Sequence, residues 1–261
     1  MHCDTVVFCC TFKADNVTMK FLRTLLSLSL CVLIGTSAFS QTNSENIRYK
    51  TYDRIVGLEN TGLYNGTEFT DPYLNTNGTY RYYNGFDYTR GSVTYNGQYY
   101  ADVFLKYDLL EDNLLSRSDD NLSVFNVKLI PDFVESFSIH GHNFVRLPDA
   151  AIKLGGNGFY EVAYLGNDTA LYIKHNKKMR DKALKKGMQY SFLNANYYLL
   201  KYHGAYTVVR SQRDFRKLFP EKSEEIRKFF KSFKTMYRSD PDAFMVQITK
   251  YLDGPNTNTN I

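Results

Sequence analysis

The chain has 261 residues, a net charge of +5 and 43% hydrophobic residues, so it is long enough to bury a core without covalent cross-links. It contains 22 tyrosines and 19 phenylalanines but no tryptophan, and its four cysteines all lie within the first 40 residues. Removal of that stretch would exclude disulfides, thiolate metal sites and cysteine nucleophiles from the remaining chain.

Residues 19–40 have the three-part layout of a secretory signal peptide. A short basic start at 19–23 is followed by the apolar run 24–34 and by small residues that end at Ser40. The apolar run is about half of the ~20 residues that a membrane-spanning helix needs. We predict that translation starts at Met19 and that cleavage follows Ser40, although a buried N-terminal helix is the alternative.

The start of translation and the compartment can both be predicted from the charges and cysteines of the chain. Residues 1–18 carry charges that do not fit a signal peptide, so we predict that they precede the true start. Cys31 lies inside the apolar run after the large Leu30, which argues against a lipid anchor. A mature chain of 221 residues without thiols favours a bacterial envelope protein, either periplasmic or released from the cell.

Charge is distributed unevenly along the mature chain. Residues 41–170 carry 10 basic and 17 acidic side chains, whereas residues 171–261 carry 19 basic and 8 acidic ones. Such asymmetry is typical of a surface that faces anions, or of two parts of one domain that attract each other, and both interpretations stay open.

Turn-forming dipeptides are frequent in the first half of the mature chain. Asn-Gly occurs at positions 65–66, 77–78, 84–85 and 96–97. Asn and Gly best tolerate the positive φ that a type I′ hairpin turn requires at both central residues. Because tyrosine and phenylalanine also favour half-buried strands, we predict a series of β-hairpins.

Strand-like segments follow one another at short intervals. Val103, Leu105, Tyr107 and Leu109 alternate with other side chains and therefore share one face of a strand. The spacing predicts an antiparallel meander rather than parallel βαβ units. The predicted strands are residues 92–95, 98–110, 122–130, 133–139, 143–147, 158–165, 170–175, 190–202 and 205–210.

The last 50 residues change to a helical period. Ser211 can cap a short helix, and Pro220 suits the first turn of another. Two apolar stripes then predict an amphipathic helix and a final helix that begins at Asp240 and stops at Gly254. The first stripe is Ile226, Phe229, Phe230, Phe233 and Tyr237, and the second is Phe244, Met245, Ile248 and Leu252.

These elements predict an α+β protein that is mainly β. An antiparallel meander, curled into a partial barrel or a twisted sheet, would be covered by two or three C-terminal helices, with the phenylalanine stripe sealing the sheet. The predicted organisation is a presequence and signal peptide (1–40), a β domain (41–210), packed helices (211–254) and a disordered tail (255–261).

Several short motifs carry a resemblance. Gly91-Ser92-Val93-Thr94-Tyr95, the strand segment 103–108, Gly158-Phe159-Tyr160-Glu161 and the segment 215–220 before an amphipathic helix occur together. The set resembles small exported proteins of unknown function from Bacteroidetes-type bacteria. The resemblance implies an origin and a compartment, and no activity comes with it.

His140 and His142 are the best candidates for metal ligands. In a strand they would share a face, but Gly141 between them indicates a turn, and two ligands are too few for a stable site. His175 and His203 could join them only if the fold brings them close, and no established ligand spacing supports this. We therefore predict no metal and no cofactor.

Other polar clusters have simpler interpretations. The acidic pairs at 111–112 and 119–120 would need an enclosed cleft for acid–base work, and we predict that they are solvated turns. The segment 71–78 departs from a calcium loop at Tyr73. The glycine-rich segment 155–158 precedes a strand rather than the helix that a phosphate cradle needs.

A basic block is the strongest feature outside the predicted core. We predict a solvated loop or short helix over residues 174–186, and a candidate site for anionic lipid or polysaccharide, with nucleic acid less favoured. A plain solvated face is the alternative. The block comprises Lys174, Lys177, Lys178, Arg180, Lys182, Lys185 and Lys186.

The sequence leads to three hypotheses of function. The first is a non-catalytic envelope module that binds an envelope protein or an apolar ligand beside its sheet. The second is a binder of anionic surfaces that works through the basic C-terminal part. The third is an enzyme whose site is dispersed along the chain, which a fold alone never excludes.

Overall fold

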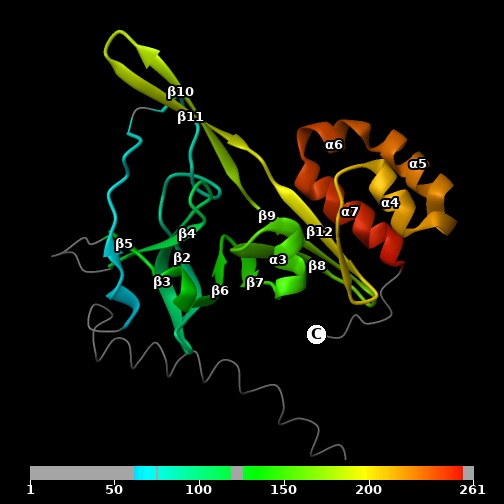
Figure 1. The fold of residues 1–261 in the computed structure, drawn as a ribbon, viewed down its shortest axis with the longest axis horizontal. Helices are drawn as coiled ribbons and strands as arrows, with labels where there is room; N and C mark the ends of the chain where they lie inside the picture. Colours follow the sequence, from blue (N-terminus) through cyan, green and yellow to red (C-terminus); the bar gives the residue numbers. More distant parts are fainter. Residues whose placement is uncertain (1–61, 75, 119–125, 255–261) are drawn as a thin grey trace, which may run out of the picture. The chain divides into compact units, whose positions relative to one another are not determined.

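The computed structural model describes residues 62–74, 76–118 and 126–254 (Figure 1). These residues all belong to one unit of the chain. The predicted presequence and signal peptide, the acidic pair at 119–120 and the predicted disordered tail lie outside the described residues. So does the first part of the predicted strand 122–130.

The predicted fold class is confirmed, because the described chain is mainly β, with one large antiparallel sheet and several C-terminal helices. The 11 strands follow the order β1-β5-β4-β3-β2-β6-β7-β8-β9-β12-β13, and the sheet is not closed. A separate two-stranded sheet pairs β10 with β11. The strands are β1 (Thr67–Glu68), β2 (Thr89–Tyr95), β3 (Gln98–Asp108), β4 (Asn113–Arg117), β5 (Asn126–Lys128), β6 (Val134–Ile139), β7 (His142–Arg146), β8 (Phe159–Leu165), β9 (Thr169–Lys174), β10 (Lys177–Leu184), β11 (Gly187–Asn194), β12 (Tyr197–Tyr202) and β13 (Ala205–Val208).

Two-residue turns with positive φ at both positions connect three pairs of neighbouring strands. Asn96-Gly97 joins β2 to β3, His140-Gly141 joins β6 to β7, and His203-Gly204 joins β12 to β13. The backbone conformation of such a turn has the same twist as the strands on either side of it. The prediction for the other three Asn-Gly dipeptides was wrong, because none of them joins two paired strands. A favourable turn dipeptide forms a hairpin only where pairing segments flank it.

The alternation in β3 is confirmed, with one interruption. Val103, Leu105 and Tyr107 are buried on one face. Asp102 has a φ of +62° and lies where the register with β2 shifts. The extra residue of this bulge explains why Tyr100, three positions before Val103, is also buried.

Four stretches differ from the predicted elements. The basic segment 174–186 is neither a loop nor a helix but the end of β9 followed by β10, whose backbone pairs fully with β11. The predicted strand 190–202 is divided into β11 and β12. Strand β4 was missed because acidic residues precede it, and so was helix α3 (Asp149–Gly155).

The C-terminal helices pack differently from the prediction. The predicted face of α7 (Pro241–Asp253) is confirmed as buried, and α7 contacts β8 and β9. The phenylalanine stripe is divided between α5 (Ser223–Ser232) and α6 (Lys234–Ser239), because the backbone leaves the helical conformation at Phe233. Phe233 is 39% exposed, and the main contacts of α6 are with α5 and α7. Thus α7 makes the main helical contacts with the sheet, while Ile226, Phe229 and Phe230 of the stripe pack in the same core cluster.

The hydrophobic core falls into two main clusters. One lies around strands β2, β3, β6 and β7, where the rings of Phe137 and Phe144 stack with centroids 4.7 Å apart. The other joins β8, β9 and β12 to α4 (Gln212–Leu218), α5 and α7 through buried residues such as Phe215 and Phe244. Among the described residues, no helix is long and apolar enough to cross a membrane. Glu161 lies on β8, and His175 directly follows β9.

Candidate functional site

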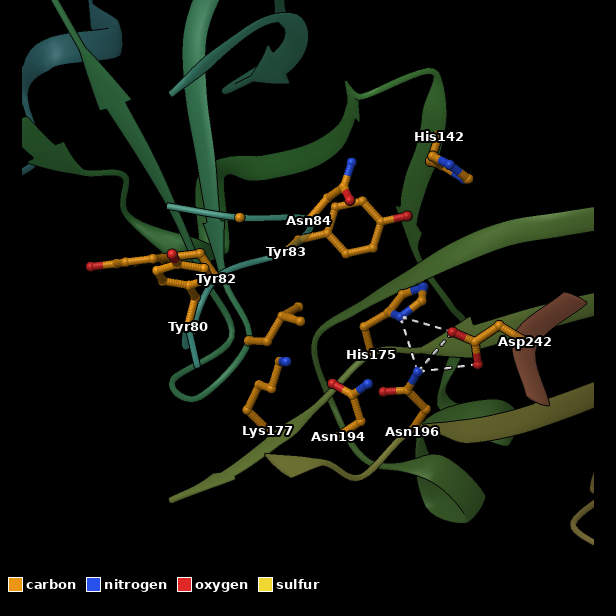
Figure 2. A pocket seen from close by; sticks show the side chains of 12 residues that line it. Tyr80, Tyr82, Tyr83, Asn84, His142, His175, Lys177, Asn194, Asn196 and Asp242 are labelled. Carbon is orange, nitrogen blue, oxygen red and sulfur yellow. Dashed lines mark hydrogen bonds and ion pairs between the residues drawn. The ribbon is translucent and has the colours of Figure 1, made fainter. Parts of the chain in front are cut away.

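A pocket of about 380 Å³ opens where six parts of the chain meet (Figure 2). They are the segment 80–85, the residue that follows β3, strand β7, the junction of β9 with β10, the junction of β11 with β12, and the first turn of α7. The lining residues are Tyr80, Tyr82, Tyr83, Asn84, Gly85, Leu109, His142, His175, Lys177, Asn194, Asn196 and Asp242. The pocket therefore combines an aromatic segment with imidazole, amide and carboxylate groups.

The aromatic segment of the pocket is held in place by backbone pairing with the end of β3. Tyr83 N donates to Tyr107 O at 2.8 Å, and Leu109 N donates to Arg81 O at 3.0 Å. The buried guanidinium of Arg81 also pairs with the carboxylate of Asp108. Because these bonds fix residues 81–83, the neighbouring tyrosines can face the pocket from a rigid support.

Glu161 links the two histidines of the pocket. Its Oε1 lies 2.6 Å from His142 Nδ1, and its Oε2 lies 2.5 Å from His175 Nε2. The carboxylate is 9% exposed, so each of its oxygens meets an imidazole in a dry environment. Burial favours the neutral carboxyl, but the bonds from His175 and His142 outweigh this and hold the pKa of Glu161 below its usual range.

A second set of bonds continues from His175 to α7. Asn196 Nδ2 lies 3.3 Å from His175 Nδ1 and 3.0 Å from Asp242 Oδ2. When His175 donates from Nε2 to Glu161, its Nδ1 is an acceptor, and the two amide protons of Asn196 serve this nitrogen and Asp242. Tyr198 donates to Asp242 Oδ1 at 2.6 Å. The polar wall is thus pre-ordered by its own hydrogen bonds.

Tyr83 lines the pocket beside its two histidines. Its ring packs edge-on against Phe144, with centroids 5.1 Å apart, and against His175 at 4.9 Å. Burial and the charges of Glu161 and Asp242 raise the pKa of Tyr83, so its hydroxyl stays protonated and can donate a hydrogen bond to a ligand.

The lowered pKa of Glu161 predicts a particular dependence of stability on pH. A carboxyl with a depressed pKa in the folded state stabilises that state above its unfolded pKa, and this contribution is lost as pH falls through the folded value. We expect Glu161→Gln to lower the free energy of unfolding by about 1–3 kcal/mol at pH 7. The difference in unfolding free energy between this variant and the original protein should shrink as pH falls below the usual glutamate pKa of 4.5.

Urea unfolding at a series of pH values measures this difference directly. Glu221→Gln is the matched control, because Glu221 is exposed and has no ion pair with another described residue. The control should behave like the original protein at every pH. A difference for Glu161→Gln that stayed constant down to pH 3 would contradict this role for Glu161.

The structure places the two predicted histidine ligands differently. His142 lines the pocket, whereas His140 lies in the β6–β7 turn with a φ of +54°. His175 joins His142 through Glu161, but His203 lies in the distant β12–β13 turn. Among the described residues, no group of three or more His, Cys, Asp or Glu side chains is placed to hold a metal ion.

The acidic turn at 111–112 is partly solvated, as predicted, because the side chains of Glu111 and Asp112 are 44% and 28% exposed, but both carboxylates also pair with cations. Asp112 accepts hydrogen bonds from Lys174 Nζ at 2.7 Å and from the hydroxyl of the buried Tyr107. Glu111 lies 3.0 Å from Arg81 Nη2. Both carboxylates therefore serve as counter-ions for buried cations, a role that sequence spacing alone did not indicate.

The seven residues of the predicted basic block do not share one surface. Lys174 is 7% exposed and ends in the ion pair with Asp112. Lys177 lines the pocket and is partly buried, which lowers its pKa. The other five are exposed on β10 and its turn.

A second hollow of about 350 Å³ lies beside Lys106. The lysine nitrogen is 4.2–4.5 Å from the ring centroids of Tyr82, Phe86 and Tyr88. Burial lowers the pKa of Lys106. The chain's own cation already fills this aromatic cage, so the arrangement is structural.

Comparison of the chain with protein-family models, with curated proteins and with solved structures finds no match. The function must therefore be argued from the pocket itself. Sequence reasoning identified His142 and His175 as candidates but missed Glu161, Asn196 and Asp242, which come from three separate elements.

Proposed function

We propose that this protein is an exported, non-catalytic binding module whose pocket takes a small hydroxyl-rich ligand such as a mono- or disaccharide. The signal-peptide pattern at residues 19–40 supports export. The volume and lining of the pocket support the ligand class.

The observation that carries the proposal is the pairing of two chemically different walls. Tyr80 and Tyr83 stand on one side, and the amides and carboxylate of Asn194, Asn196 and Asp242 stand on the other (Figure 2). Tyr82 also lines the pocket, but it is 2% exposed and its ring belongs to the cage around Lys106. A sugar ring presents C–H groups on its faces and hydroxyls around its edge. Aromatic rings pack against the C–H groups of the sugar faces. Side chains that donate and accept hydrogen bonds bind the hydroxyls around the edge.

The polar lining favours this ligand over the apolar one expected from composition. Leu109 is the only aliphatic side chain among the pocket residues, and it is 5% exposed. An apolar ligand bound here would displace water from Asn194, Asn196 and Asp242 without replacing the hydrogen bonds that the water makes. A ligand rich in hydroxyls would replace those bonds.

Glycan-array screening followed by calorimetric titration tests the proposal. Tyr80→Ala and Asn194→Ala each remove one contact from opposite walls, and both residues are exposed enough for the fold to tolerate the change. We expect each variant to weaken sugar binding about tenfold, or ~1.4 kcal/mol, through loss of one stacking or hydrogen-bonding contact.

Two matched substitutions serve as controls. Tyr251→Ala removes a tyrosine of similar exposure on α7, and Asn143→Ala removes an exposed asparagine on β7, and neither residue lines the pocket. Both should retain full affinity. Absence of any glycan ligand, or equal losses in controls and pocket variants, would refute the proposal.

A second candidate function rests on the orientation of His142. Its Nδ1 is held by Glu161, its side chain is 47% exposed, and no described residue bonds to its Nε2. A histidine oriented in this way can accept a proton from a bound hydroxyl or water. Mass spectrometry of the sugar after incubation separates the two functions, since cleaved products that disappear in His142→Gln would identify an enzyme.

A further inference from the structure

The β10–β11 hairpin has two faces of different composition. Side chains alternate across a strand, so Lys178, Arg180 and Lys182 of β10 share one face, while Asp181 lies on the other. Their partners on β11 are Leu193, Ser191 and Gln189, in that order. The cationic face therefore contains no acidic residue.

The opposite face is covered by this chain only around Tyr190 and Phe192, and its Met179 and Met188 are each 38% exposed. The ring of Tyr73 lies 4.9 Å from that of Tyr190 and 5.8 Å from that of Phe192. Asn77 N also donates to Tyr190 O at 3.3 Å. These contacts fix the hairpin through one face and leave the cationic face open.

Apolar side chains are exposed on the same open face. Leu184, next to the turn, is 43% exposed, and Leu193 is 39% exposed. The turn itself consists of Lys185 and Lys186, both exposed. None of the five cations forms an ion pair with another described residue.

We infer that this face, defined by Lys178, Arg180, Lys182, Leu184 and Leu193, docks on the surface of a lipid bilayer that contains anionic headgroups. Cations near such a surface are attracted to it, and leucines among them can enter the boundary between headgroups and acyl chains. A soluble polyanion would use the cations but leave the leucines in water. This inference does not depend on the sugar-binding proposal, because none of these residues lines the pocket.

Co-flotation of the full chain with vesicles tests the inference. The probes are phosphatidylcholine vesicles with and without phosphatidylglycerol, and immobilised heparin represents a soluble polyanion. Of the two kinds of vesicle, we expect binding only to those with phosphatidylglycerol, and we expect salt to weaken it. Lys178→Gln/Arg180→Gln/Lys182→Gln should reduce it at least about tenfold, as three surface cations are removed. Leu184→Ser/Leu193→Ser should reduce vesicle binding severalfold while leaving heparin retention unchanged.

The matched control is Lys228→Gln/Lys231→Gln/Lys234→Gln, which removes three exposed cations from α5 and α6. This variant should bind vesicles like the original protein. Equal losses in the two triple variants would overturn the inference, because binding would then follow net charge alone. So would heparin retention with no vesicle binding, or a leucine variant that binds vesicles normally. All the hairpin variants should keep their sugar affinity, which separates this test from that of the pocket.

Discussion

Replacement of Arg81 by Met is expected to lower the free energy of unfolding by about 3–5 kcal/mol, because it leaves the carboxylate of Asp108 buried without its cation. Arg81 and Asp108 are 1% and 0% exposed, and Arg81 Nε donates to Asp108 Oδ1 at 3.0 Å. Burial raises the pKa of Asp108 even though the guanidinium opposes this, so removal of Arg81 should leave the carboxyl largely protonated or the region unfolded.

Urea unfolding of the single and double variants checks this expectation. Arg81→Met/Asp108→Leu removes both charges and should lose less stability than the sum of the single substitutions. Arg90→Met is the control, because Arg90 pairs with Asp102 at the surface, where ion pairs contribute about 1 kcal/mol or less. Additive losses, or a control as unstable as Arg81→Met, would contradict the assignment of Arg81 as the anchor of the 80–85 segment.

Phe244→Ala is expected to cost about 3–5 kcal/mol of unfolding free energy, since it removes a fully buried ring from the centre of the helical cluster. Phe244 is 0% exposed, and its ring centroid lies 4.8 Å from that of Phe230 and 4.9 Å from that of Tyr237. It also lies on the helix that contacts β8 and β9. Thermal or urea unfolding monitored by circular dichroism measures the loss.

Phe233→Ala is the variant to compare with Phe244→Ala in the same unfolding experiment. Phe233 belongs to the predicted stripe but is 39% exposed at the break between α5 and α6, so its loss should cost about 1 kcal/mol or less. If Phe233→Ala destabilised the protein as much as Phe244→Ala, the stripe rather than α7 would hold the helices on the sheet.

The general fold was predictable because it depends on local patterns. Alternation in β3, the Asn96-Gly97 turn and the apolar face of α7 each follow from neighbouring residues, and the structure confirms all three. The basic segment 174–186 was misjudged because its charges suggested solvent on all sides. Backbone pairing with β11 and the contacts of Tyr190 with Tyr73 allow an exposed strand there.

The site was less predictable, because its residues come from distant elements. Glu161 is one carboxylate in a strand, and only the pairing of β8 with β7 and β9 brings it between His142 and His175. The sequence around Asp242 indicates only the first turn of a helix. A carboxylate is favoured there by the helix dipole, whether or not it has another role. No short-range pattern could show that Asn196 connects it to His175.

A crystal structure of the protein with a sugar found by array screening would show whether the pocket is the binding site. We expect one sugar between Tyr80 and Tyr83 on one side and Asn196 and Asp242 on the other, with its hydroxyls within hydrogen-bonding distance of the amide and the carboxylate. A sugar bound at another surface, with this pocket holding only water, would contradict this expectation.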